Sequence, residues 1–128
     1  MPRSSRTSAL IAALALVAAL AAASTVSAAG PTAQASKHCS TGSGRGLGPT
    51  YAFQLSVSHT SCGNGRKLIR AYNSCRHRHG GKKGHCSGVY GYHCSEHRFN
   101  DSRFQFDARV KCSKSGGRRI NHTYTQNL

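Results

Sequence analysis

Residues 104–125 read FQFDARVKCSKSGGRRINHTYT, and this stretch decides the fold. From Phe104 to Cys112 every second residue is apolar, which is the pattern of a strand with one buried face. Gly116-Gly117 provides a hairpin turn, and the alternation resumes over 119–125. We therefore predict an antiparallel hairpin whose second strand places Ile120, His122 and Tyr124 on one face.

The segments before this hairpin supply a helix and two more strands. Residues 51–58 alternate like a half-buried strand, and 89–94 predicts another. Between them, Thr60 or Ser61 is suited to cap a helix whose apolar face ends at Cys75. The first strand is predicted to bury Tyr51, Phe53, Leu55 and Val57. The sequence thus predicts an α+β fold, with one helix packed on a small, mainly antiparallel sheet in the order β-α-β-β-β.

The start of the chain has the composition of a signal peptide. Arg3 and Arg6 precede an apolar run that is shorter than the roughly 18 to 20 residues of a membrane span, so we expect export and no transmembrane segment. Small residues permit cleavage after Ala28 or Ala35. We expect residues 1–35 to be a signal peptide, 36–49 a flexible lead-in rich in Gly and Ser, and 50–128 a single extracellular domain.

Charge and cysteine content indicate how this domain is held together. The chain has 18 Lys plus Arg against 3 Asp plus Glu, a net charge of +15 that falls to +13 without Arg3 and Arg6. So few large apolar residues accompany this charge that a core alone is insufficient, and an even number of cysteines in an exported chain predicts three disulfides. Their pairing is left open by the sequence. The cysteines are Cys39, Cys62, Cys75, Cys86, Cys94 and Cys112.

Several short motifs resemble a group of small exported bacterial proteins that contain disulfides and have no assigned activity. The motifs are Thr60-Ser61-Cys62, Arg66-Lys67, Ala71-Tyr72, Gly91-Tyr92-His93-Cys94, Gln105–Cys112, Arg119-Ile120 and His122–Thr125. The resemblance spans roughly Thr60 to the end of the chain. It implies a shared scaffold and brings no catalytic residues with it.

The positive charge points to a partner. Residues 76–85 contain no apolar residue and are predicted to form a solvated basic loop. A domain of this charge attracts anionic polymers and surfaces, and exposed tyrosines would add stacking platforms. We therefore expect a monomeric, non-enzymatic binding module without a cofactor, for a cell-wall polyanion, nucleic acid or anionic lipid. The predicted binding residues are Arg76, Arg78, Lys82, Lys83, Arg98, Arg103, Arg118 and Arg119.

Two alternative functions belong to other classes. Glu96 and His122, with the arginines before His122, resemble in loose outline the catalytic groups of small secreted guanyl-specific ribonucleases. The spacing and cysteine pattern differ, and His122 alternates with apolar residues, which favours a histidine packed inside the sheet. A stapled domain with an exposed loop is also a suitable scaffold for an inhibitor of an extracellular enzyme.

Histidines provide a further alternative, extracellular copper or nickel binding. Cleavage after Ala35 would create the amino terminus Ser36-Lys37-His38, which can chelate Cu(II) or Ni(II) through its amine, two amides and an imidazole. His77, His79 and His85 of the basic segment are expected to bind metal more weakly. The predicted metal residue is therefore His38.

Overall fold

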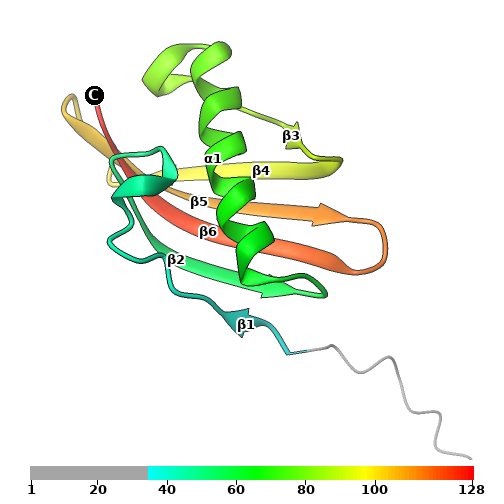
Figure 1. Ribbon diagram of the computed structural model, residues 1–128. Coiled ribbons are helices and arrows are strands. Elements are labelled where there is room, and N and C mark those ends of the chain that lie inside the picture. Colours follow the sequence, from blue (N-terminus) through cyan, green and yellow to red (C-terminus); the bar gives the residue numbers. More distant parts are fainter. Residues whose placement is uncertain (1–34) are drawn as a thin grey trace, which may run out of the picture. The chain divides into compact units, whose positions relative to one another are not determined.

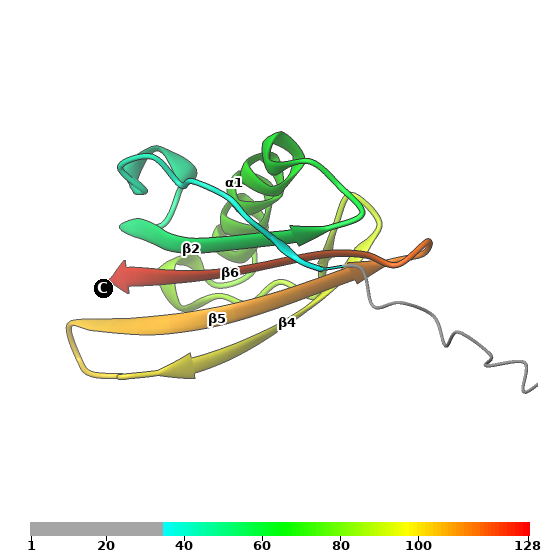
Figure 2. The same cartoon turned by 90° about the horizontal axis from the view of Figure 1, so that it is seen from below.

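The computed structural model describes residues 35–128, and all but the last residue of the predicted signal peptide lies outside this range. A six-stranded antiparallel sheet has the order β1-β2-β6-β5-β4-β3, and one helix, α1, packs on one of its faces (Figures 1 and 2). Within residues 35–128, no helix is long and apolar enough to cross a membrane. The elements are β1 (Lys37–His38), η1 (Arg45–Leu47), β2 (Tyr51–Ser58), α1 (Cys62–Arg78), η2 (Gly81–Lys83), β3 (Gly88–Val89), β4 (Tyr92–Phe99), β5 (Gln105–Lys114) and β6 (Arg118–Asn127).

The predicted α+β class is confirmed, and the strand count and order differ from the prediction. β5 and β6 form the expected hairpin, with Gly116 and Gly117 both at positive φ between them. The run 89–94 was expected to be one strand, but Tyr90 and Gly91 have φ of 53° and 74° and turn the chain between β3 and β4. Two successive positive φ values are what a tight hairpin turn requires. The sheet therefore gains β3 at one edge and β1 at the other.

The predicted buried face of β2 is only half correct. Leu55 and Val57 are buried as expected, whereas Tyr51 and Phe53 are exposed and Ala52 is buried. The cause is an irregularity between Ala52 and Gln54, where the pairing with β6 skips Phe53. One inserted residue reverses the orientation of every side chain beyond it, because alternate residues of a strand face opposite sides.

Helix α1 begins where the sequence predicted and ends later. The Ser61 hydroxyl accepts a hydrogen bond from the Asn64 amide at 3.1 Å and caps the first turn. The helix then runs to Arg78, so the first three residues of the predicted basic loop are helical. Arg76 is buried, which corrects the prediction that residues 76–85 are solvated throughout.

The structure pairs the six cysteines into the three predicted disulfides. Two disulfides tie a residue outside the helices and strands to α1, and one links the strands β4 and β5 at residues that lie directly opposite each other in the register. The pairs are Cys39–Cys62, Cys75–Cys86 and Cys94–Cys112.

The segment expected to be a flexible lead-in packs against the domain. Leu47 belongs to the hydrophobic core. On α1, Arg66 donates to the Ser40 carbonyl at 3.2 Å, and Arg70 donates to the Gly46 carbonyl at 3.3 Å. Two helix arginines are thereby engaged in holding this segment, and they are less available to an external anion.

Candidate functional site

The sheet face beneath α1 contains the only glutamate of the chain. The Glu96 side chain is 3% exposed. Its Oε2 accepts hydrogen bonds of 2.8 Å from the Tyr72 and Tyr124 hydroxyls, and its Oε1 accepts one of 2.6 Å from Arg98 Nε. Burial raises the pKa of both tyrosines, and the Glu96 carboxylate raises it further, so the hydroxyls remain protonated donors. The carboxylate is therefore fully engaged inside the protein.

Arg76 is held in the same layer. It is 0% exposed and donates to the Lys82 carbonyl, to Asn73 Oδ1 and to Gln126 Oε1 at 2.9 to 3.0 Å. Its guanidinium lies over the Tyr124 ring, 4.6 Å from the centroid. These contacts replace part of the water that a buried cation loses, while Arg76 Nε has no hydrogen-bond partner within residues 35–128.

Arg98 is also engaged in this layer. Besides Glu96, it donates to the Gly84 carbonyl at 2.7 Å and lies 4.2 Å from the centroid of the Phe106 ring. Its side chain is largely buried. Two members of the predicted binding set, Arg76 and Arg98, thus have their guanidinium groups engaged inside the protein, where they are less available to a partner.

His122 lies beneath α1 as well. It packs edge-on against Tyr72, and neither of its nitrogens has a hydrogen-bond partner within residues 35–128. Burial lowers the pKa of His122 to about 3, and the nearby Arg76 charge contributes in the same direction. The imidazole is therefore neutral at physiological pH. Both residues of the ribonuclease-like pair, Glu96 and His122, thus have buried side chains.

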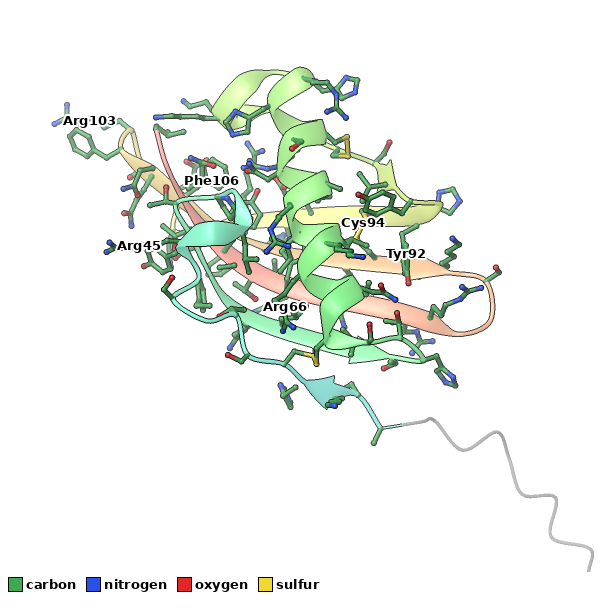
Figure 3. All side chains as sticks on the ribbon, viewed as in Figure 1. Arg45, Arg66, Tyr92, Cys94, Arg103 and Phe106 are labelled. Atoms are coloured by element: carbon green, nitrogen blue, oxygen red, sulfur yellow. A yellow bond between two sulfur atoms is a disulfide. The ribbon has the colours of Figure 1, made fainter. Side chains whose placement is uncertain are left out.

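The remaining predicted binding residues do not form one patch. Arg78, Lys82 and Lys83 lie at the carboxyl end of α1 and in η2, whereas Arg103 lies in the β4–β5 turn (Figure 3). Arg118 and Arg119 begin β6, at the opposite end of β5 from Arg103. Ten residues of strand separate these ends by about 33 Å. A single binding site of ordinary size would not include all of these residues.

The sheet face opposite α1 brings Arg119 of the predicted binding set together with two cations that the prediction did not select, Arg109 and Lys111. We call this surface the open face, because within residues 35–128 no helix covers it (Figure 2). Its side chains alternate with the buried ones on four neighbouring strands. They are Gln54 and Ser56 on β2, Arg119, Asn121 and Thr123 on β6, Arg109 and Lys111 on β5, and His93, Ser95 and His97 on β4.

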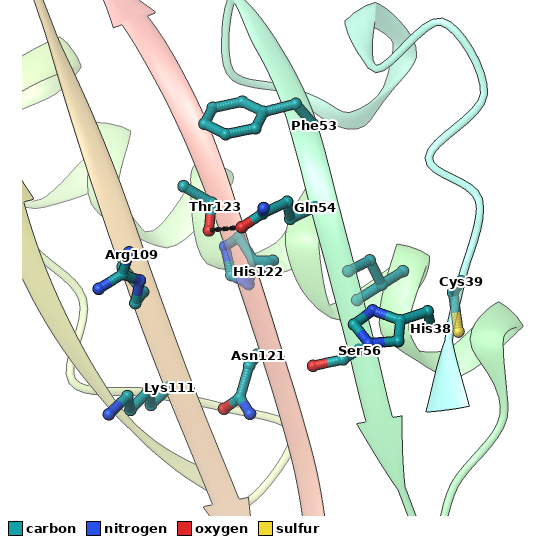
Figure 4. Close-up of a pocket in the computed structure, with 11 residues that line it drawn as sticks. His38, Cys39, Phe53, Gln54, Ser56, Arg109, Lys111, Asn121, His122 and Thr123 are labelled. Atoms are coloured by element: carbon teal, nitrogen blue, oxygen red, sulfur yellow. Dashed lines mark hydrogen bonds between the residues drawn. The ribbon is translucent and has the colours of Figure 1, made fainter. Parts of the chain in front are cut away.

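Two adjoining hollows follow the open face. One, of about 320 Å³, is lined by Arg109, Lys111 and Asn121 and reaches Phe53 at one end and His38 at its side (Figure 4). The next, of about 550 Å³, shares Lys111 and Asn121 and continues to Arg119. The two hollows therefore form one shallow track that passes three cations.

Within the described part of the chain, no acceptor competes for these three cations. Within residues 35–128, Arg109, Lys111 and Arg119 make no side-chain hydrogen bond or ion pair. The one carboxylate on the strands of this face, Asp107, accepts hydrogen bonds from Asn100 and Thr125. The positive potential of the open face is therefore left for an external anion.

His38 lies at the edge of this face, in β1. Lys37 and His38 pair with Val57 and Ser56 of β2. The predicted chelate needs the amide nitrogens of both residues, so a metal would compete with this pairing. Within residues 35–128, no group of three or more His, Cys, Asp or Glu side chains is placed to hold a metal ion.

The sequence contained part of the signal for the open face. Arg109 and Lys111 are on the polar side of the clearest strand in the chain. Periodicity alone does not reveal whether a polar face is free, covered by another layer or neutralised by acids. That information comes from the arrangement of the strands.

Comparison with known proteins identifies no relative. No protein-family model matches the chain, and neither a curated protein nor a solved structure is significantly similar to it. The site is therefore interpreted from its own chemistry.

Proposed function

We propose that this protein is a secreted cationic module that binds anionic polymers through the open face. The observation that carries this proposal is the track of Arg109, Lys111 and Arg119, three exposed cations that have no hydrogen-bond or ion-pair acceptor within residues 35–128. The predicted signal peptide supports secretion. The three disulfides are compatible with it, because disulfides persist in oxidising compartments.

The spacing of the track suits a polymer with repeated charges. Arg109 and Lys111 are two residues apart on β5, about 7 Å along the strand. Arg119 lies on the neighbouring strand and pairs with Ser113, two residues beyond Lys111. A chain of anions lying along the face would meet one cation after another, and Asn121 and Ser56 offer hydrogen bonds beside them.

Arginine and lysine have complementary parts in such a contact. The Arg109 guanidinium presents a planar fork that can bind two oxygens of one phosphate or carboxylate, whereas Lys111 provides a compact charge. Because the sheet holds the backbone of both residues, binding orders only their side chains. The conformational entropy lost on binding is correspondingly small.

The proposal is tested with charge-matched variants. Arg109→Gln/Lys111→Gln removes two cations from the open face, and Lys82→Gln/Lys83→Gln removes two from η2. With inorganic polyphosphate as the probe, we expect the first variant to bind more weakly and with a flatter dependence on salt, because fewer counterions are released. The η2 variant should stay close to wild type. If the η2 variant alone loses affinity, the open face is not the binding surface.

A further inference from the structure

We infer that the polymer bound on the open face is a single-stranded nucleic acid, whose bases stack on aromatic rings at one end of the cation track. This inference rests on the proposed function and specifies its ligand. It is carried by aromatic rings of β2 and β4, all exposed except the half-buried Phe99, that lie near the cations and that polyanion binding alone does not explain.

The first group of rings is on β2. Tyr51 and Phe53 are 43% and 45% exposed, and their ring centroids are 6.0 Å apart. The β2 irregularity at Phe53 accompanies this exposure, since it places both rings outside the core. Two neighbouring large rings in water are unfavourable unless a ligand covers them.

The second group is on β4, across the sheet. His97 and Phe99 stack with centroids 6.5 Å apart and planes inclined by 17°. The Arg109 guanidinium lies 5.6 Å from the Phe99 centroid. A cation of the track is thereby held against an aromatic face, an arrangement that suits a base next to its own phosphate.

The position of Phe53 links the rings to the track. Phe53 lines the first hollow at one end, whereas Lys111 and Asn121 line it at the other, with Arg109 on the side of β5 (Figure 4). A strand lying along this hollow would place a base on Phe53 and the following phosphates on Arg109 and Lys111. Stacking needs a free base face, which a single strand exposes and a duplex hides.

Other polyanions satisfy only part of this surface. A polyphosphate or a phosphate-linked cell-wall polymer would engage the cations and leave the rings uncovered, because it has no planar π system. The nucleic acid covers both. Binding through stacking and phosphates is tolerant of sequence, since every base has a π face.

The test compares two probes that share a backbone. One is a thymidine 20-mer, and the other is an abasic deoxyribose-phosphate 20-mer. We expect wild-type protein to bind the thymidine oligomer more tightly at the same salt concentration. Phe53→Ala should weaken thymidine binding at least about fivefold, because one stacked base contributes about 1 to 3 kcal/mol. The same variant should leave abasic binding unchanged.

Phe104→Ala is the matched control. Phe104 is 67% exposed and lies in the β4–β5 turn, beside Arg103 and outside the track. We expect this variant to bind both oligomers like wild type. Phe53→Trp should retain affinity, and its indole, the only one in the chain, should be quenched by thymidine and not by the abasic oligomer.

The outcomes separate the two proposals. Equal affinity of wild type for the two oligomers overturns the nucleic-acid inference and leaves polyanion binding in place. Equal weakening of both oligomers by Phe53→Ala, with an unchanged melting temperature, also overturns it. If wild type binds neither the oligomers nor polyphosphate, the proposed function fails as well.

Discussion

Beneath α1, Arg76 and Arg98 are surrounded by acceptors and aromatic rings, whereas on the opposite side of the sheet Arg109 and Lys111 are exposed and, within residues 35–128, make no hydrogen bond or ion pair. The four residues lie within two layers of one small domain. The comparison shows that the cationic side chains of this protein fall into two groups. The buried group stabilises the fold. The exposed group is free to bind an anionic ligand, and we expect only this group to contribute to recognition.

Of the two buried arginines, Arg98 depends on Glu96. A buried cation is tolerable when a carboxylate and enough hydrogen bonds accompany it, and here one carboxylate serves Arg98 and two tyrosines. On the open face the carboxylate of Asp107 accepts from Asn100 and Thr125 and, within residues 35–128, pairs with no cation. The cations there remain hydrated until a ligand binds. Substitutions on the two faces should therefore affect different measurements.

Reduction of the three disulfides should have the largest effect, because both faces depend on an intact sheet. Each disulfide contributes roughly 2 to 4 kcal/mol by restricting the unfolded chain. We expect the reduced and alkylated protein to lose its cooperative thermal transition. A reduced protein that melts within a few degrees of the oxidised one would show that the core suffices without disulfides.

Loss of the buried Glu96 carboxylate should have the next largest effect on stability. Glu96→Gln removes the charge that compensates Arg98 and should lower the free energy of unfolding by about 3 to 5 kcal/mol, as for other broken buried pairs. Urea denaturation measures this loss. Asp101→Asn is the control, because Asp101 is exposed and its replacement should change stability by less than about 0.5 kcal/mol. Similar losses of stability in the two variants would show that the buried Glu96 carboxylate contributes no more to stability than an exposed one.

His122 should make the free energy of unfolding depend on pH, an effect of intermediate size. The folded protein keeps His122 neutral down to a pKa of about 3, whereas the unfolded chain takes up the proton near 6.5. Stability is therefore complete above pH 6.5 and falls as the pH is lowered toward 3, by up to about 1.4 kcal/mol per unit. His122→Leu should remove this contribution, because it leaves no imidazole to protonate in either state.

The control for this measurement is His77→Leu, since the His77 side chain is exposed on α1. We expect the stability of this variant to fall as the pH is lowered, by the same amount as in wild type. At pH 7, His122→Leu should keep wild-type stability to within about 1 kcal/mol, because the imidazole nitrogens it removes have no partners. A larger loss of stability at pH 7 would mean that the His122 imidazole makes a stabilising hydrogen bond, contrary to the structure.

The smallest effect on stability should come from the open face. Arg109→Gln/Lys111→Gln removes two exposed cations that make no hydrogen bond or ion pair within residues 35–128, and we expect a change within about 0.5 kcal/mol in urea denaturation. The same variant should have the largest effect on polyphosphate binding. A substantial loss of stability would show that these cations belong to the group that stabilises the fold.

The sequence predicted the elements better than it predicted the faces. Alternation over 104–125 and the Gly116-Gly117 turn determine β5 and β6, and Ser61 determines the start of α1. The irregularity at Phe53 was missed, because a single inserted residue leaves the alternation of residue types intact while it reverses the side chains.

Two residues of the predicted binding set, Arg76 and Arg98, are buried, and the burial of Arg76 could have been predicted. The spacing of Arg76 from Tyr72 continues the inner face of α1 by one further turn, so the position was recoverable from helical periodicity. The surrounding basic composition favoured a loop and concealed it. The burial of Arg98 could not be predicted in the same way, because it depends on Glu96 and on Gly84 of a distant segment.

The central claim is that the exposed cations of the open face bind the polymer. It is tested most directly by a titration of ¹⁵N-labelled protein with the thymidine 20-mer, followed by amide chemical shifts. We predict that the largest changes fall on β5 and β6 around Arg109, Lys111 and Asn121, and that residues 79–87 change little. Changes concentrated in 79–87, with β5 and β6 unaffected, would contradict the account.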